Sequence, residues 1–317
     1  MLAIQDAWNS TDLPNGCVAT IGNYDGVHRG QQAILERVVR RGRELGFPSV
    51  VVTFEPHPLA VLRPREAPPL IATPEQKQAA LAEAGVDTLL VLRFDRALSA
   101  VAAEAFTREF LARRLGVREL WVGSRFRFGR GREGDVGLLT RIGEQLGFAV
   151  CGVPEVLFAG EPISSTRIRR ALLDGAVEDA AAMLGSPFEL TGVVLRGDRM
   201  GQRLGWPTIN VAVDNELVPR DGVYATRVEL SGMPGSFAAA TNIGTRPTVY
   251  ENYQRVVESH ILDFASDVYG QRVALRFHRR LREERIFATI MDLSAQIGRD
   301  VEATRELFLA GEREAGG

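Results

Sequence analysis

Residues 192–210, GVVLRGDRMGQRLGWPTIN, decide how the second half of this chain is interpreted. Glycines leave the backbone open to close approach by a polyphosphate, and three of them stand here: Gly197, Gly201 and Gly205. The Thr208 hydroxyl and the Asn210 amide offer neutral oxygen ligands to a hard cation such as Mg²⁺. The stretch therefore predicts a phosphate-handling site, although glycines near Pro207 are equally typical of β-hairpin turns.

A single acid in a later strand is the second informative feature. Residues 257–264 (VESHILDF) alternate like a strand and carry Glu258 among apolar neighbours. Such an acid most often belongs to a solvated face of the sheet. Beside a bound triphosphate, a carboxylate instead takes the proton from an attacking hydroxyl, as general-base catalysis of phosphoryl transfer requires. The residue alone leaves both interpretations open.

The order of motifs in the second half resembles the riboflavin kinase family from about residue 186 to the end. The Gly-rich turn is followed by PTIN at 207–210, TNIGTRPT at 241–248, ESHILDF at 258–264, Tyr269-Gly270, and LREE at 281–284 with Phe287. The resemblance implies a six-stranded antiparallel β-barrel with a C-terminal helix, which phosphorylates riboflavin to flavin mononucleotide (FMN).

The same resemblance assigns roles to individual residues. It implies that Thr208 and Asn210 bind Mg²⁺ and the ATP phosphates. Glu258 would activate the ribityl hydroxyl, and Arg282 would lie on the flavin side. The family usually has Arg, Phe and Ala at three positions where this chain has Gln202, Trp206 and Ile209.

The first half predicts an open α/β sheet that binds ligands at its strand ends. A short apolar strand at residues 18–21 is followed by a glycine turn at 22–26 and a helix over 31–45. Unpaired amides and the helix dipole face such a turn, which makes it an anion site within reach of His28. Further strands are expected at 50–54, 88–92 and 119–122.

Residues 22–32 resemble the nucleotidylyltransferase superfamily, and specifically the adenylyltransferase half of the bacterial bifunctional riboflavin kinase/FAD synthetases. Segments TFEPHP at 53–58, FRFGRGR at 126–132 and ISSTRIR at 163–169 support the match. The resemblance implies a Rossmann-like domain that transfers AMP from ATP to FMN, with His28 catalytic. It places the nucleotide at Gly22, Asn23, Asp25, Gly30, Gln31, Ser164, Ser165, Thr166 and Arg167, and the flavin at Phe54, Pro56, His57, Pro58, Phe126 and Phe128.

Two departures from this pattern leave three hypotheses open. Gln31 stands where the superfamily has the second histidine of His-x-Gly-His, and Arg125 stands where the family commonly has Asp or Asn. Charged donors bind anions about twice as strongly as neutral ones, so we expect Gln31 to slow FAD formation. The hypotheses are a bifunctional enzyme, a kinase whose first half serves as a scaffold, and a non-enzymatic flavin- or nucleotide-binding regulator.

Composition sets the remaining expectations. With 317 residues, 45% of them hydrophobic, and a net charge of −2, we expect two soluble domains without affinity for nucleic acid or membranes. Two cysteines flanked by apolar residues favour buried thiols in a reducing cytoplasm. A helix over 172–184, broken at 185–187, predicts domains 1–185 and 186–317, and residues 291–314 predict one or two closing amphipathic helices. The sequence does not indicate an oligomeric state.

Overall fold

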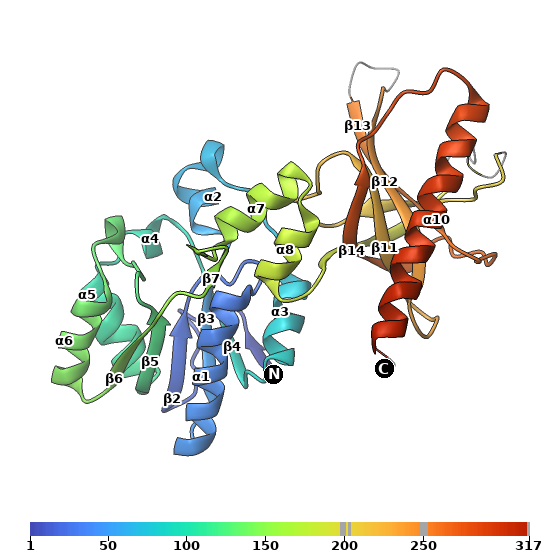
Figure 1. The fold of residues 1–317 in the computed structure, drawn as a ribbon. Coiled ribbons are helices and arrows are strands. Elements are labelled where there is room, and N and C mark those ends of the chain that lie inside the picture. Colours follow the sequence, from blue (N-terminus) through green and yellow to red (C-terminus); the bar gives the residue numbers. More distant parts are fainter. Residues whose placement is uncertain (197–200, 202–203, 248–252, 316–317) are drawn as a thin grey trace. The chain divides into compact units, whose positions relative to one another are not determined.

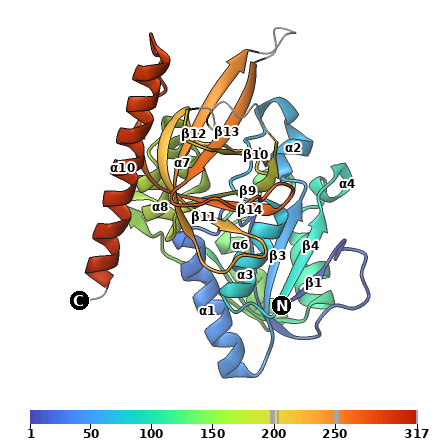
Figure 2. The same cartoon turned by 90° about the vertical axis from the view of Figure 1, so that its right-hand side faces the viewer.

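The computed structural model describes residues 1–196, 201, 204–247 and 253–315. The chain divides into two compact units, Met1–Ser165 and Thr166–Gly317. The first is an α/β unit and the second contains a β-barrel and a long terminal helix (Figures 1 and 2). The predicted fold class is therefore confirmed for both halves.

The α/β unit is built on a six-stranded parallel sheet in the order β1-β4-β3-β2-β5-β6. Its strands are β1 (Leu2–Ile4), β2 (Cys17–Ile21), β3 (Ser49–Glu55), β4 (Thr88–Arg93), β5 (Val117–Gly123) and β6 (Ala149–Val153). Strand β2 is buried along its whole length, as expected of a central strand covered on both faces. The four strands predicted from apolar runs are all present.

Each face of this sheet packs against its own layer of helices. Val51 faces Leu35 of α1 (Arg29–Leu45) and Leu81 of α3 (Pro74–Glu83) in one cluster. Val50 and Val52 face the other way, into a second cluster with residues of the π-helix η2 (Phe106–Arg114) and of α6 (Val136–Leu146). Successive strand side chains thus supply the two hydrophobic cores of a three-layer unit.

Short elements complete this unit around the sheet. They are α2 (Pro58–Leu62), η1 (Pro64–Glu66), α4 (Arg96–Ser99), α5 (Ala103–Ala105), η3 (Arg130–Arg132) and the hairpin β7 (Leu157–Phe158) and β8 (Glu161–Pro162). Of the two free cysteines, Cys17 is buried in β2, and burial raises the pKa of its thiol to about 12. Cys151 is only partly buried, so the expectation of a buried thiol holds for Cys17 alone.

The helix expected over 172–184 is wrong in its bounds. The structure has two helices here, α7 (Ser165–Asp174) and α8 (Val177–Leu184). Gly175 separates them with φ of 81°, a left-handed conformation that ends a helix readily only at glycine. Both helices fall almost wholly in the second unit, and α8 packs on the barrel strands β9 and β14.

The barrel closes in the strand order β10-β13-β12-β11-β14-β9, with every neighbouring pair antiparallel. Its strands are β9 (Phe188–Leu195), β10 (Ile209–Val213), β11 (Gly222–Leu230), β12 (Phe237–Pro247), β13 (Tyr253–Ile261) and β14 (Arg272–Arg282). Alternate residues point inward, as the strict burial alternation along β9 illustrates. Phe188, Tyr224 and Phe277 fill part of the interior with ring contacts.

A single helix, α10 (Ile290–Ala315), packs along β11 and β12 of the barrel (Figure 2). Val301 and Phe308 on one stripe of the helix are buried. Arg282, the last residue of β14, grips Asp300 of α10: its Nε lies 3.0 Å from both carboxylate oxygens and its Nη2 lies 2.8 Å from Oδ2. The two side chains are 13% and 7% exposed, so this ion pair is largely withdrawn from water.

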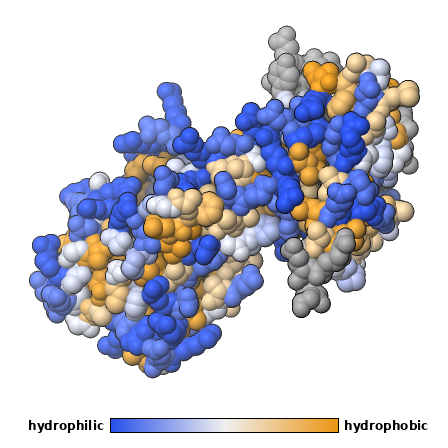
Figure 3. Space-filling model, in the orientation of Figure 1, coloured by the Kyte–Doolittle hydropathy of each residue, from blue (hydrophilic) through white to orange (hydrophobic). Residues whose placement is uncertain are grey.

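The surface of each unit is mixed in polarity. On the face drawn in Figure 3, hydrophobic residues lie in small areas between hydrophilic ones. The exposed large apolar side chains come from many different elements, and examples are Leu45, Leu146, Leu157, Leu195 and Leu309. Such scattered exposure is ordinary for a folded protein surface.

Replacing Asp300 tests how strongly the buried ion pair holds α10. We expect Asp300→Ala to lower the free energy of unfolding of the barrel unit by about 3 kcal/mol, because it leaves the Arg282 guanidinium without its partner. Urea unfolding followed by circular dichroism measures this loss.

The matched control is Asp263→Ala, which breaks a more exposed pair between Asp263 and Arg305 of the same helix. A loss below about 1 kcal/mol is expected there, since exposed ion pairs contribute little. Equal losses in the two variants would show that burial of the Arg282 pair is unimportant.

Candidate active sites

The strand order of the α/β unit brings two predicted motifs to one edge of the sheet. From β2 the chain first builds β3 and β4 on one side, where β4 also pairs with the earlier strand β1, and only later builds β5 and β6 on the other side. The carboxyl ends of the paired strands β2 and β5 therefore form a topological switch point, where α/β sheets bind ligands. The turn at residues 22–28 follows β2, and the segment at residues 124–128 follows β5.

The turn after β2 is held in a fixed shape by its own side chains. Tyr24 and Val27 adopt positive φ angles of 49° and 41°. The buried Tyr24 hydroxyl lies 2.7 Å from the Thr20 hydroxyl of β2. A Cβ on Gly22 would lie 3.1 Å from the Tyr24 ring, so glycine suits this tight contact. The backbone around the predicted anion site is thus preformed.

His28 caps the N-terminus of α1 and is 8% exposed. Its buried Nδ1 has no hydrogen-bond partner among the described residues. Gly30 makes room for the ring, because a Cβ there would lie 3.2 Å from Nδ1. Burial lowers the pKa of His28 from 6.5 to about 4, so the imidazole is neutral at neutral pH. A buried, unsatisfied ring nitrogen at a helix N-terminus fits an anionic ligand.

Gln31 has a structural task at this helix terminus. Its side-chain Oε1 accepts a hydrogen bond of 3.1 Å from the backbone N–H of His28. Gln31 is the third residue of α1, and a Gln there that reaches back to the N-cap backbone stabilises the first turn. The amide NH₂ group remains as the only donor that Gln31 can offer an anion.

Asn23 and His57 connect the turn to the end of β3. The Asn23 side-chain amide lies 3.0 Å from His57 Nε2, and the Asn23 carbonyl accepts from the Thr53 hydroxyl at 3.1 Å. His57 Nδ1 accepts from the Leu59 N–H at 3.2 Å and so caps α2. Both residues organise the site, whatever they contact in a substrate complex.

Asp25 is buried and serves the loop that follows η1. Its carboxylate accepts from the backbone N–H groups of Ile71 at 2.9 Å and Ala72 at 3.2 Å. Its backbone carbonyl accepts from the Ser165 hydroxyl at 3.0 Å. Ser165 thereby joins the start of α7 to the turn after β2, while Thr166 and Arg167 lie in the first turn of α7.

Aromatic side chains line the segment after β5. The Phe126 and Phe128 rings stack with centroids 5.5 Å apart, and the buried Phe128 continues into the core. Phe54, at the end of β3, meets Phe94 edge-on at 5.8 Å. Pro56 is exposed and Pro58 begins α2. These residues provide apolar surface of the kind that a flavin ring requires.

Arg125, the second departure from the family pattern, is paired on the surface. Its guanidinium contacts the carboxylate of Glu155, and the Arg125 side chain is 72% exposed. The ion pair balances the added positive charge within the unit. This departure therefore places no isolated charge beside Phe126.

The barrel aligns three polar residues across adjacent strands. Glu258 of β13 is directly opposite Asn210 of β10 on one side and Asn242 of β12 on the other. The neighbouring row points into the barrel, where fully buried hydroxyls form hydrogen bonds: Thr226 to Thr241 at 2.7 Å and Thr241 to Ser259 at 2.8 Å. Since successive side chains alternate between faces, Asn210, Glu258 and Asn242 share the outer face.

Two polar residues near Glu258 were not singled out as site residues from the sequence. Asn242 donates a side-chain hydrogen bond to Glu284, which also accepts from the Thr245 backbone. Partial burial and then the charge of Asp221 raise the pKa of Glu284. Gly244 leaves space for its carboxylate, because a Cβ there would lie 2.0 Å from Glu284 Oε1. Both residues fall in motifs that carry the family resemblance, TNIGTRPT at 241–248 and LREE at 281–284, and this was the feature of the sequence that could have indicated them.

The Gly-rich turn is described only in part, and Gly197 lies outside the described residues. A Cβ on Gly201 would lie 2.3 Å from the Trp206 carbonyl oxygen and 3.3 Å from Thr208 Oγ1. Gly205 has φ of 82°, which favours glycine. The turn thus closes tightly against Thr208, and both glycines are required by its geometry.

Arg282 contacts other residues of the protein. Besides Asp300 it donates to the Glu283 carbonyl at 2.9 Å, and its guanidinium lies 5.7 Å from the centre of the Phe287 ring. These contacts secure the end of β14 to α10.

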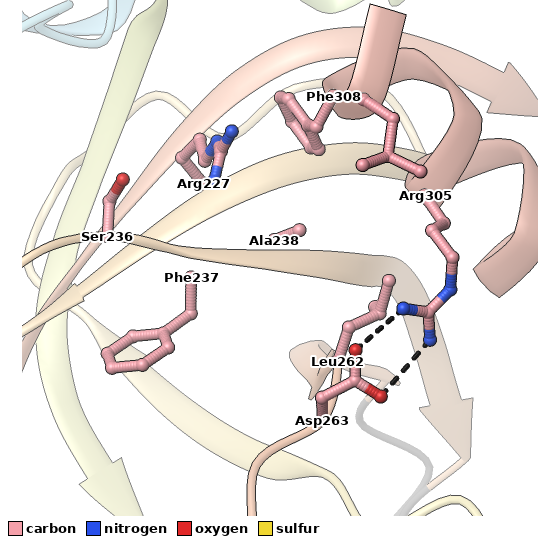
Figure 4. Close-up of a pocket in the computed structure, with 9 residues that line it drawn as sticks. Arg227, Ser236, Phe237, Ala238, Leu262, Asp263, Arg305 and Phe308 are labelled. Carbon is pink, nitrogen blue, oxygen red and sulfur yellow. Dashed lines mark hydrogen bonds and ion pairs between the residues drawn. The ribbon is translucent and has the colours of Figure 1, made fainter. Parts of the chain in front are cut away.

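A cavity of about 230 Å³ lies between the barrel and the C-terminal half of α10 (Figure 4). Arg227 stacks over Phe308 at 4.3 Å on one side, and Arg305 pairs with Asp263 at 2.6 Å on the other. The cavity lies at the start of β12 and just beyond the end of β13. It does not include the row of Asn210, Glu258 and Asn242.

Within the described residues, no cluster of three or more His, Cys, Asp or Glu side chains is arranged to hold a metal ion. In the same part of the chain, none of the helices has the length and apolar character needed to cross a membrane.

Comparison with known proteins gives the family. A family model for FAD synthetase matches residues 10–167, and one for riboflavin kinase matches residues 184–308. The bifunctional riboflavin kinase/FMN adenylyltransferase of Escherichia coli K12 is 41% identical over 97% of this chain and 98% of its own. The chain belongs to the bifunctional riboflavin kinase/FMN adenylyltransferase family.

A second relative carries the same name, and a solved structure with a different description shares the fold. The enzyme of the same name from Pseudomonas fluorescens is 44% identical over 92% of this chain and 93% of its own. A crystal structure described as a macrolide-efflux protein from Streptococcus pneumoniae has a TM-score of 0.86 at 27% identity, covering 96% of this chain and 99% of that one. Membership of the family favours the bifunctional hypothesis over a kinase alone and over a non-enzymatic regulator.

The buried His28 should make the α/β unit sensitive to acid. The unfolded chain binds a proton at His28 with a pKa near 6.5 and the folded chain only near 4, so acid favours unfolding between these values. We expect about 3 kcal/mol of stability to be lost from His28 as the pH falls from 6.5 to 4.

The measurement is the unfolding free energy of the parent and of His28→Gln at several pH values. The difference between the two proteins isolates His28 from other acid-sensitive groups such as His278, whose pKa is also lowered by burial. A parallel pH dependence in the two proteins would contradict the assigned pKa.

Proposed function

We propose that the barrel unit phosphorylates riboflavin with ATP and that the α/β unit then joins AMP from ATP to FMN, giving FAD and pyrophosphate. Family membership supports both activities. The observation that carries the kinase assignment is the alignment of Asn210, Glu258 and Asn242 on three neighbouring strands. It puts one carboxylate between two amides at the edge of a glycine-rich turn.

In the kinase reaction, Glu258 would act as the general base. Its carboxylate takes the proton of the ribityl 5′-hydroxyl while that oxygen bonds to the γ-phosphorus of ATP. The bond from the γ-phosphorus to its bridging oxygen breaks, and ADP leaves. Asn242, held by Glu284, would orient the Glu258 carboxylate from the neighbouring strand.

The oxygen ligands near Glu258 suit a divalent cation, and specifically Mg²⁺. Thr208 and Asn210 offer a hydroxyl and an amide oxygen, and hard cations prefer such oxygen ligands. The close packing of Gly201 against Thr208 brings the glycine turn to the same place. When bound, the cation would neutralise charge on the phosphate oxygens. Thr208 and Asn210 would hold it, with the remaining ligands from ATP and water.

In the adenylyl transfer, the phosphate of FMN attacks the α-phosphorus of ATP and pyrophosphate leaves. The N-terminus of α1 and the turn after β2 would bind the polyphosphate through Gly22, Gly30 and the donors around them. Ser164, Thr166 and Arg167 are proposed to contact the same phosphates. Phe54, Phe126 and Phe128, with the adjoining prolines, would receive the flavin ring.

His28 would become charged only when the nucleotide is bound. Its neutral ring in the free protein follows from burial, and an approaching polyphosphate stabilises the protonated form. The imidazolium then donates a charged hydrogen bond as negative charge develops on the leaving pyrophosphate.

Three broader expectations complete the proposal. The functional boundary is proposed at residues 185 and 186, supported by family matches that end at 167 and begin again at 184. The proposed location is the cytoplasm, where ATP is available. Riboflavin, FMN and ATP are its proposed partners, with no role for nucleic acid or membranes.

Replacing Glu258 tests the assigned base. Glu258→Gln should slow FMN formation by at least about 100-fold, because the amide cannot accept the hydroxyl proton. Separation of riboflavin, FMN and FAD over time, with ATP and Mg²⁺ present, measures the effect.

Two controls accompany this variant. FAD formation from supplied FMN should be unchanged in it, and Glu229→Gln on β11 should leave both reactions intact. Full FMN production by Glu258→Gln would show that the base is another group.

A series at position 31 tests whether the neutral donor limits the second reaction. Gln31→His should speed FAD formation from FMN, because it restores a chargeable donor at the helix N-terminus. Gln31→Met should slow it, since no donor remains. The lost bond to the His28 N–H should cost each variant about 1 kcal/mol of stability. Equal rates in all three proteins would mean that Gln31 does not contribute to this step.

A further inference from the structure

Two ring side chains hold the backbone immediately before Thr208. His260 Nδ1 lies 2.7 Å from the carbonyl oxygen of Pro207. A carbonyl only accepts hydrogen bonds, so Nδ1 carries the proton and donates it. His260 follows Glu258 by two residues on β13 and therefore shares its face.

Trp206 connects the same segment to the terminal helix. Its indole N–H donates to the Ser294 hydroxyl of α10 at 3.0 Å. The ring packs in a cluster with Ala240 of β12 and with Ile297 and Val301 of α10. The Trp206 backbone N–H also donates to the Gly201 carbonyl at 2.8 Å, which closes the glycine turn.

The two rings also contact each other. The Trp206 and His260 centroids are 5.5 Å apart at an interplanar angle of 88°, an edge-to-face arrangement that aromatic pairs favour. Strand β13, the residues before Thr208 and helix α10 are thereby joined through one continuous set of contacts. A Phe, usual in the family at position 206, keeps the ring but has no N–H to bind Ser294.

We propose that Trp206 and His260 are positioning residues of the kinase site, which fix Pro207 so that the Thr208 hydroxyl and the Asn210 amide are aligned before ATP arrives. Ordering a backbone segment costs about 1–2 kcal/mol per residue, and a preformed segment does not incur that cost on binding. The Ser294 contact makes α10 part of the ATP site. This inference rests on the kinase function proposed above for Thr208 and Asn210.

The first test uses Trp206→Phe, Ser294→Ala and the double variant. Each single variant should raise the KM for ATP in FMN formation roughly 3–10-fold, the value of one hydrogen bond, with kcat changed less than about twofold. The double variant should be no worse than either single one, because both remove the same bond. Additive effects, or an unchanged KM in both single variants, would overturn the role of the indole N–H.

The second test separates positioning from mere stability at His260. His260→Ala should lower kcat/KM for FMN formation roughly 10-fold, since the Pro207 carbonyl loses its donor. His260→Asn, which places an amide N–H near the position of Nδ1, should restore most of that loss. Failure of Asn to restore activity while Tm matches the parent would contradict the proposal.

The bifunctional chain supplies its own control. FAD formation from supplied FMN should be equal in all these variants, since the α/β unit is untouched.

If the parent makes no FMN, the proposed kinase function fails. NMR signals of the indole N–H groups then test on their own whether the Trp206–Ser294 contact holds the segment before Thr208. The chain has three tryptophans, and Trp206→Phe identifies the Trp206 indole N–H in an NMR spectrum. Mg²⁺-ATP should shift that signal, and Ser294→Ala should speed its hydrogen exchange. Absence of both effects would refute the positioning role of the Trp206–Ser294 hydrogen bond.

Discussion

Strand register in the barrel is the constraint on which the proposed kinase site depends. The Thr226, Thr241 and Ser259 hydroxyls form a buried chain that ends on the Ala239 carbonyl, which sets its direction from Ser259 toward Thr226. A slip of β13 by one residue would break this chain and turn Glu258 toward the interior. Because unpaired buried hydroxyls are costly, this chain of hydrogen bonds fixes the strand register and thereby keeps the Glu258 carboxylate on the outer face.

The two proposed sites would bind phosphate by different physical means. The α/β unit offers backbone amides at a helix terminus and a neutral His28 that awaits charge. The barrel offers a closed glycine turn and neutral oxygens on a rigid strand frame. In the α/β unit the charge of the protein itself would respond to the anion, and in the barrel a cation would be needed between the protein and the nucleotide.

The sequence predicted the architecture well because the signals were local. Apolar runs marked the buried strands, and glycine turns marked the strand ends where we propose that ligands bind. It failed at Gly175, where the apolar pattern continues through a left-handed residue that splits the expected helix. It also missed Asn242 and Glu284, because their meeting depends on pairing between strands far apart in the chain. Likewise, the engagement of Arg282 with Asp300 follows from where α10 packs, which no motif states.

The low pKa of His28 has a consequence for how the adenylyl site empties. A ring that takes up a proton when polyphosphate enters must release it when pyrophosphate leaves, because the empty pocket favours the neutral form. Under the proposed mechanism, each catalytic cycle would include the uptake and release of one proton at the buried His28. Loss of that proton would weaken the binding of the product, so alkaline conditions would speed the release of pyrophosphate and acid would slow it.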